Sequence, residues 1–193
     1  KLVCLDISEY NLFNLKNELL NYKINRNLDI SLSFILASIN DKNQVDNVFR
    51  EFKIDIVFHA AAYKHVELIE ENIISAIETN IFGFQNVVNS SINYKVNKFL
   101  FVSTDKAVRP TSMMGHTKRF AEIYLQYLNL QNNISTIFGV VRFGNVFGSA
   151  GSVIELFNNQ INNKLPITIT HPDATRYFMT IPEASILLIQ TLA

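Results

Sequence analysis

Short apolar runs alternate with amphipathic stretches along all 193 residues, and this alternation constrains the fold more than any other feature. The apolar runs read as buried strands and occupy residues 1–6, 31–38, 54–62, 98–104 and 136–145. Strands separated by helices form right-handed crossovers and a parallel sheet with helices on both faces. We therefore predict an α/β fold, a Rossmann-like doubly wound parallel sheet.

The stretches between these runs have helical spacing. In residues 9–24, Leu12, Leu15, Leu19 and Leu20 share one helix face. Further helices are predicted at 41–52 behind an Asp41 N-cap, at 73–94, at 113–130, at 152–162, and from Pro182 as the first helical residue. The chain is less regular between the last two of these helices.

Composition excludes several classes of protein. The net charge is zero, so no general attraction to nucleic acid or to anionic membranes is expected. Cys4 is the only cysteine, which excludes a disulfide framework and favours a reducing, cytoplasmic setting. No apolar run reaches membrane-spanning length, and no cluster of His, Cys and carboxylate side chains has metal-site spacing. We expect no metal and no membrane contact by this segment.

Unusual residues follow the predicted strands. They are Asp6, "HAAAYKH" at 59–65, "STDK" at 103–106 and "RFGN" at 142–145. In an open parallel sheet, ligands bind outside the carboxyl ends of the strands. The sequence therefore predicts a ligand site at that edge.

Several of these residues admit an ordinary structural role beside a functional one. Asp6 suits the ribose hydroxyls of a dinucleotide, and it equally suits a helix N-cap. Ala60, Ala61 and Ala62 would let a flat ligand approach the backbone, or would serve tight strand–helix packing. Lys64 and His65 could meet a phosphate or sugar, or belong to a solvated loop.

The second half of the chain offers the same alternatives. Asp105 and Lys106 form either a surface ion pair or a proton donor and acceptor in a cleft. Met114 and Lys118 lie four residues apart and so share a helix face. Asn145, with the small residues "GSAGS" at 148–152 after it, could contact a ligand or form a turn. Arg176 could clamp a phosphate or make a surface ion pair.

The order of the motifs resembles a known family. "VFHAAAYKHV", "TNIFGFQNVV", "STDKAVRPT", "MGHTKR", "RFGNVFGSAGSV" and "THPDATRYFMTIPEA" are similar to the polysaccharide-biosynthesis branch of the extended short-chain dehydrogenases. The likeness is strongest to bacterial UDP-N-acetylglucosamine 4,6-dehydratases of the capsule and O-antigen type. Met114 stands where many of these enzymes have a catalytic Tyr, which resembles the large, membrane-anchored subtype.

The resemblance implies an internal redox reaction. Bound NAD(P)+ takes hydride from carbon 4 of the sugar, water is eliminated across carbons 5 and 6, and the hydride returns to carbon 6. Thr104 would bond the substrate near carbon 4, with Ser103 as a second hydroxyl beside the coenzyme. Asp105 would protonate the leaving hydroxyl, Lys106 would be the base that removes the carbon-5 proton, and Lys118 would hold the nicotinamide ribose. Met114 cannot accept a proton, so Asp105, Lys106 and a water stay open as the first base.

The resemblance also implies binding residues and partners. Ala60, Ala61, Ala62, Asp6, Ile39 and Asn80 would contact the coenzyme or support its site, and the Asp6 carboxylate favours NAD over NADP. Lys64, His65, Asn145 and Arg176 would face a UDP-sugar. A homo-oligomer and a cytoplasmic catalytic domain are expected.

The beginning and end of the sequence suggest a fragment. The opening "KLVCLDISEY" has no initiator Met and no glycine-rich phosphate loop before it, so the first strand of the sheet is expected to be missing. Residues 1–193 then form a single domain, in which roughly 146–193 begin a substrate-binding lobe. A nucleotide-sugar epimerase of the same family and a non-catalytic nucleotide-sugar binder are the alternatives.

Overall fold

The computed structural model describes residues 1–148, 153–169, 171–173 and 175–192. Its strands are β1 (Leu2–Asp6), β2 (Leu32–Leu36), β3 (Ile56–His59), β4 (Lys98–Thr104), β5 (Ile137–Phe143), β6 (Asn145–Val146) and β7 (Phe178–Met179). Its α-helices are α1 (Glu9–Asn25), α2 (Lys42–Phe52), α3 (Val66–Glu71), α4 (Ile73–Ile77), α5 (Phe84–Asn93), α6 (Met113–Asn129), α7 (Val153–Asn162) and α8 (Ile181–Gln190). A π-helical segment, η1 (Glu78–Gly83), and a 3-10 turn, η2 (Asp105–Ala107), complete the described elements.

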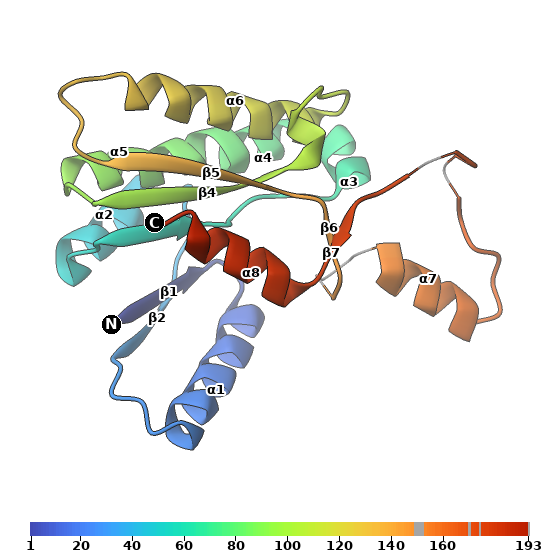
Figure 1. Cartoon of the computed structure of the whole chain (residues 1–193), viewed down its shortest axis with the longest axis horizontal. Helices are drawn as coiled ribbons and strands as arrows, with labels where there is room; N and C mark the ends of the chain where they lie inside the picture. The colour runs from blue at the N-terminus through green and yellow to red at the C-terminus, as the bar shows by residue number, and fades with distance from the viewer. Residues whose placement is uncertain (149–152, 170, 174, 193) are drawn as a thin grey trace.

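All described strand pairs are parallel, as the alternating pattern predicts. β3, β4 and β5 form one sheet in that order, and β1 pairs with β2 on the β3 side of it (Figure 1). β6 pairs with β7 in a separate two-stranded sheet. This is a Rossmann-like arrangement, which confirms the predicted fold class.

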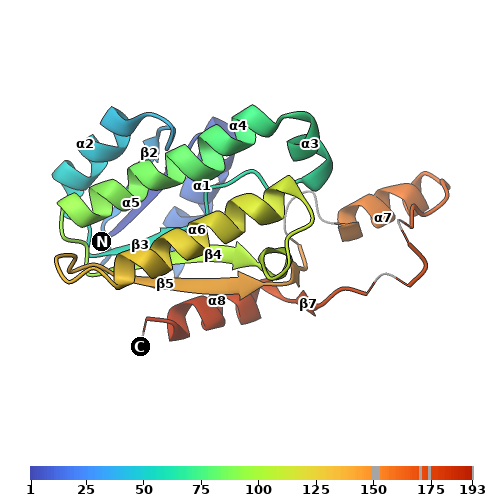
Figure 2. The ribbon, with the colours of Figure 1, turned by 90° about the horizontal axis from the view of Figure 1, so that it is seen from above.

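The helices cover the three-stranded sheet on both faces. Figure 1 shows α4, α5 and α6 on the upper side of β4 and β5 and α8 on the lower side. The main hydrophobic core lies between the sheet and the upper helices, and Phe84, Phe99, Phe101 and Leu125 are among its fully buried members. α7 projects away from this body in both views (Figures 1 and 2).

Side-chain caps set the starts of α1, α2, α6 and α8. The Asp41 side chain accepts hydrogen bonds from the backbone N–H groups of Asn43 and Gln44, so the predicted N-cap of α2 is confirmed. The expectation that α8 starts at Pro182 is wrong by one residue. Thr180 is the N-cap in a capping box with Glu183, which makes Ile181 the first helical residue.

The helix predicted at 73–94 has the right extent and an unpredicted interruption. Its middle is the π-helical segment Glu78–Gly83, in which Asn80 is buried. An ideal Cβ on Gly83 would lie 2.4 Å from the Asn40 side-chain oxygen and 2.9 Å from Ile39 Cγ1, so the close approach requires glycine. Such single turns of π-helix occur frequently at functional sites.

The apolar face predicted for α1 is mostly uncovered. Leu12 is buried, whereas Leu15 and Leu20 are exposed. Spacing thus gave the helix correctly, because the exposed leucines still lie on a regular helix from Glu9 to Asn25.

Candidate functional site

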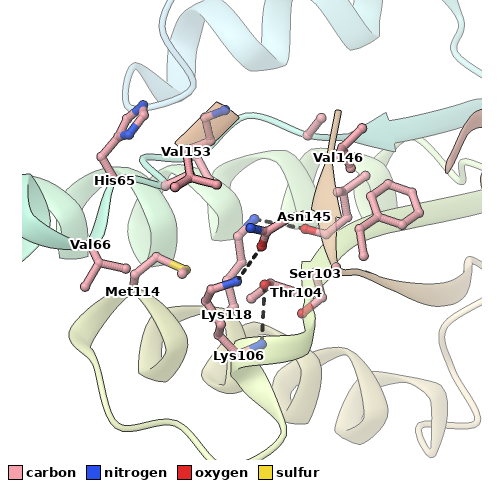
Figure 3. A pocket seen from close by; sticks show the side chains of 16 residues that line it. His65, Val66, Ser103, Thr104, Lys106, Met114, Lys118, Asn145, Val146 and Val153 are labelled. Atoms are coloured by element: carbon pink, nitrogen blue, oxygen red, sulfur yellow. Dashed lines mark hydrogen bonds between the residues drawn. The ribbon is translucent and has the colours of Figure 1, made fainter. Parts of the chain in front are cut away.

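A pocket of about 330 Å³ opens where β3, β4 and β5 end. A pocket of this size is at the small end of the usual range for ligand sites, about 300–1,000 Å³. The side chains that line it include these residues singled out in the sequence: Ala60, Ala62, Lys64, His65, Ser103, Thr104, Lys106, Met114, Lys118 and Asn145 (Figure 3). The structure therefore brings together residues from four separate motifs, at the strand ends where the sequence predicts a ligand site.

A short hydrogen-bonded chain of polar groups stands at one side of the pocket. The Thr104 hydroxyl donates to Asp105 Oδ1 at 3.0 Å, and Lys106 Nζ donates to the same oxygen at 3.0 Å. Lys106 Nζ also donates to Asn145 Oδ1 at 3.3 Å, as the dashed line in Figure 3 shows. The Asp105 and Lys106 side chains are 33% and 36% exposed, so water can reach both. Lys106 lines the pocket, whereas Asp105 is not among the residues that line it and meets the pocket only through Thr104 and Lys106.

The protonation state of Asp105 follows from its neighbours. Partial burial alone would raise its pKa, but the hydrogen bond and charge of Lys106 and the hydrogen bond from Thr104 outweigh that effect. The net result is a lowered pKa, so Asp105 is ionised at neutral pH. In this state it accepts protons, and it can act as an acid only after it has received one.

Lys118 lies deep in the pocket and is held by β4. Its Nζ donates to the Val102 carbonyl at 2.9 Å and lies 4.6 Å from the centre of the Phe101 ring. Burial lowers the pKa of Lys118 to about 8. A lysine with such a pKa is partly neutral just above pH 7, which suits proton exchange as well as ribose binding.

His59 is a buried group that sequence reasoning missed. It ends β3, and its ring stacks against Phe99 and Phe101. Burial, and secondly the charge of Lys118, lower its pKa to about 3, so the ring is neutral. Its Nε2 has no hydrogen-bond partner among the described residues.

Met114 fills the position at which the resemblance expects a tyrosine. Only 5% of its surface is exposed, and it packs with Ile69 and Ala76 in a small apolar cluster that Val66 and Met113 extend. Glu70 of α3 accepts a hydrogen bond from the Met113 backbone N–H at 2.7 Å and so ties α3 to the start of α6. The surroundings of Met114 are therefore packed around a thioether.

A buried carboxylate on α6 is the second feature that sequence reasoning missed. Glu122 is 1% exposed and accepts hydrogen bonds from Ser103 Oγ at 2.6 Å, Arg142 Nε at 2.8 Å, Arg142 Nη2 at 2.6 Å and Arg119 Nη1 at 3.0 Å. Glu122 follows Lys118 by four residues, so the same helix-face rule that linked Met114 and Lys118 extends to it. The four-residue spacing from Lys118 was therefore the sequence feature that could have pointed to Glu122.

Asn80 connects the loop after β3 to α6. Its side chain bonds the Tyr63 backbone in both directions, with Tyr63 N–H donating at 2.8 Å and the amide donating to the Tyr63 carbonyl at 3.0 Å. The same amide donates to Thr117 Oγ1 at 3.1 Å. Asn80 thus supports the walls of the pocket, although it does not line it.

Other predicted residues lie away from this pocket. Asp6 accepts a hydrogen bond from the Ser8 backbone N–H at 2.7 Å, and Ser8, not Asp6, caps α1. Ile39 is buried in the main core, so only a small part of it could touch a ligand. Arg176 is exposed and donates to the Thr175 carbonyl. Ala61 does not line the pocket either, and most of "GSAGS", residues 149–152, lies outside the described residues.

Two absences concern the described part of the chain only. Among these residues, no group of three or more His, Cys, Asp or Glu side chains is arranged to hold a metal ion. Within the same residues, no helix has the length and apolar character needed to cross a membrane.

Comparisons with known proteins agree with this picture. A sequence model of the family described as "Polysaccharide biosynthesis protein" matches residues 1–193. The chain is 48% identical to the capsular polysaccharide biosynthesis protein CapD of Staphylococcus aureus over 98% of this chain and 31% of CapD. It is 39% identical to the UDP-glucose 4-epimerase of Rickettsia akari, over 79% of this chain and 45% of the epimerase.

Among solved structures, Pen from Bacillus thuringiensis has the same fold. It superposes with a TM-score of 0.87 at 38% sequence identity, over 97% of this chain and 55% of Pen. The chain thus spans about a third of CapD and about half of Pen.

Proposed function

The chain belongs to the polysaccharide biosynthesis protein family, and from this premise we propose that the protein carrying it is an NAD(P)-dependent 4,6-dehydratase of UDP-N-acetylglucosamine. The observation that carries the proposal is the hydrogen-bonded chain of Thr104, Asp105, Lys106 and Asn145 at the pocket. It places a proton acceptor, a hydroxyl and an amine side by side, which a coupled oxidation and elimination needs.

Thr104 and Asp105 together replace the missing phenol in this proposal. The Thr104 hydroxyl already donates to the ionised Asp105, so it can accept the proton of the sugar's carbon-4 hydroxyl while it passes its own proton on. Asp105 then holds one proton. That proton is available to the carbon-6 hydroxyl, which needs it to leave as water, so the same carboxyl serves as base and later as acid.

Lys106 is assigned to the carbon-5 proton. An ammonium group cannot accept a proton, so Lys106 must first release one to water, which reaches its side chain at 36% exposure. The carboxylate of Asp105 at 3.0 Å and the amide oxygen of Asn145 at 3.3 Å hold its Nζ at the pocket. Asn145 therefore orients this amine, in addition to any contact with the UDP-sugar.

The pocket residues fit a dinucleotide coenzyme, which would supply the hydride acceptor and donor. Lys118, with its pKa lowered to about 8, would hold a ribose hydroxyl, and the small side chains of Ala60 and Ala62 would let a flat ring approach the backbone. We favour NAD over NADP because the Asp6 carboxylate would repel a phosphate on the ribose. Clearly tighter binding of NADP+ than of NAD+ would remove Asp6 from the coenzyme site.

Mass spectrometry of the reaction tests the proposal. The protein, expressed with all flanking sequence its gene encodes, is incubated with UDP-N-acetylglucosamine and coenzyme. We expect a product lighter by one water, a 4-keto-6-deoxy sugar nucleotide. A product of unchanged mass and altered configuration would contradict it.

The 39% identity to a UDP-glucose 4-epimerase favours epimerisation as the second candidate. An epimerase would use the same coenzyme and the same first proton transfer, without elimination. A non-catalytic nucleotide-sugar binder is a third candidate, motivated by Met114. It predicts tight binding of UDP-N-acetylglucosamine with no change in mass or configuration. Homo-oligomerisation and a cytoplasmic catalytic domain are further proposals, which sedimentation and cell fractionation would test.

A further inference from the structure

We propose that Glu122 commits the Ser103 hydroxyl as a hydrogen-bond acceptor toward the pocket, so that the ligand group facing Ser103 must be a donor. The inference rests on the proposed function for its choice of ligands. Glu122 acts through Ser103 and is a positioning residue, whereas Ser103 is the group that meets the ligand.

The direction of the Ser103–Glu122 hydrogen bond follows from the charge of the carboxylate. Burial alone would raise the pKa of Glu122, but hydrogen bonds from Arg142, Ser103 and Arg119 lower it further than burial raises it. Glu122 is therefore ionised, and an ionised carboxylate can only accept. The 2.6 Å bond must use the proton of the Ser103 hydroxyl, which leaves only lone pairs for a ligand.

The strands and α6 hold this arrangement in one geometry. Ser103 and Arg142 are register partners on β4 and β5, so their side chains stand together on the sheet face that α6 covers. Glu122 receives both, while Lys118, one turn earlier on α6, bonds the Val102 carbonyl. Two consecutive residues near the end of β4 are thus held by α6, and the Ser103 hydroxyl is directed at Glu122.

Ser103 lines the pocket beside Lys118 and Thr104 (Figure 3). The ligand groups that could donate to it are an amide N–H or a hydroxyl. In the proposed reaction these come from two sources, the carboxamide of a nicotinamide coenzyme or the hydroxyl and acetamido groups of the sugar. A carbonyl or a phosphate oxygen facing Ser103 would receive no hydrogen bond from its hydroxyl.

The coenzyme arm of the test compares NAD+ with 3-acetylpyridine adenine dinucleotide, in which a methyl group replaces the carboxamide nitrogen. Dissociation constants are measured calorimetrically with the protein expressed with all flanking sequence its gene encodes. A neutral hydrogen bond contributes about 0.5–1.5 kcal/mol, so we expect Ser103→Ala to reduce the preference for NAD+ by about twofold to thirteenfold. The sugar arm compares UDP-N-acetylglucosamine with UDP in the same way.

Two further variants separate this role from a general structural one. Ser91→Ala removes another buried serine hydroxyl, one bonded to the Val87 carbonyl and absent from the pocket lining, and should leave both ratios unchanged. Glu122→Gln offers Ser103 an amide donor and so frees its proton. In that background Ser103→Ala should change the ratios by less than in the wild type.

The outcomes are distinct. A change in only one arm identifies the source of the donor and supports the inference. Binding of both ligand pairs, with ratios that Ser103→Ala leaves unchanged, overturns the inference and leaves the proposed function standing. Failure of the wild type to bind either NAD+ or UDP-N-acetylglucosamine overturns both. The Ser103→Ala comparison is decisive even where Glu122→Gln does not fold.

Discussion

Two carboxylates, Glu122 and Asp105, flank the end of β4. They differ in how exposed they are and in how many hydrogen bonds they accept. Glu122 is 1% exposed, and three side chains donate four hydrogen bonds to it. Asp105 is 33% exposed, and it shares one oxygen between Thr104 and Lys106. The pKa of each is lowered by cations and hydroxyl donors against the opposing effect of burial.

The difference in burial suits the two ion pairs to different roles, one structural around Glu122 and one chemical around Asp105. Around Glu122 every oxygen is engaged and water is excluded, so the carboxylate fixes its neighbours and is not free to exchange a proton. Around Asp105 the pair stays accessible, and a surface ion pair of this kind contributes little to stability. We infer that the buried pair stabilises the geometry of the pocket and that the exposed pair is free to do chemistry in it.

The largest effect that would break this division is expected from Asp105→Asn. The amide keeps the shape of the carboxylate but cannot accept a proton, and loss of a general acid or base costs about 10²–10⁴-fold in rate. We expect a fall in kcat of that size, with little change in the free energy of unfolding. Turnover of UDP-N-acetylglucosamine and chemical denaturation measure the two quantities.

Two companions of Asp105→Asn make this prediction specific. Lys106→Ala should lower kcat similarly, because it removes the partner amine. Asp29→Asn changes an exposed carboxylate in the loop before β2 and should leave kcat unaltered. Retention of more than a tenth of wild-type turnover in both Asp105→Asn and Lys106→Ala would show that the chemistry lies elsewhere.

The converse variant, Glu122→Gln, should act on stability. It removes the charge that Arg142, Arg119 and Ser103 share, but both arginines are more than a third exposed and can be hydrated. The loss should therefore fall below the 3–5 kcal/mol of a wholly buried pair, at about 1–3 kcal/mol. Urea denaturation measures it, with the exposed Glu18→Gln as the matched control. Equal midpoints for the two variants would contradict the anchoring role.

The same two regions show how far the sequence could predict the molecule. The strands β1 to β5, most helices and the position of the pocket followed from local periodicity and from the rule that parallel strands end together. The small sheet of β6 and β7 did not. The exposed pair was visible because Asp105 and Lys106 are adjacent in the chain. The roles of the site residues stay predictions.

The buried network could not be read from the sequence, because its members are separated. Ser103 and Arg142 lie 19 and 20 residues from Glu122, and only the pairing of β4 with β5 and the packing of α6 bring them together. The π-helical turn at Glu78–Gly83 escaped prediction for a similar reason. Periodicity gives one helix there, and the turn depends on the tertiary contacts of Gly83 and Asn80.

A smaller effect is expected on the pH dependence of the free energy of unfolding. It comes from Lys118, which is buried one turn before Glu122 on α6. Its pKa of about 8 is below the usual value of 10.5, so between these values the unfolded chain binds more protons than the folded one. Stability should therefore rise with pH there, by roughly 1 kcal/mol from pH 8 to 9. The free energy of unfolding of wild type minus that of Lys118→Met isolates this contribution. A difference that stays flat or falls with pH would mean that burial does not lower the pKa of Lys118 in the folded protein.

The smallest effect is expected from Met114→Tyr, which tests whether the missing phenol left a defect. If Met114 were a damaged tyrosine, restoring the ring should raise kcat by about 10²-fold or more, the effect of a general base. We expect a change of less than about tenfold, because Thr104 and Asp105 already form a proton-accepting pair beside the pocket. The packed cluster of Met114 with Ile69 and Ala76 also leaves little room for the ring of a tyrosine, and overpacking commonly costs about 1–3 kcal/mol.

Turnover and denaturation of Met114→Tyr, with Met114→Leu as the control for volume, separate the two explanations. A hundredfold gain in kcat for the tyrosine variant alone would mean that the exposed pair is not the base, and the division between the two carboxylates would then have to be redrawn.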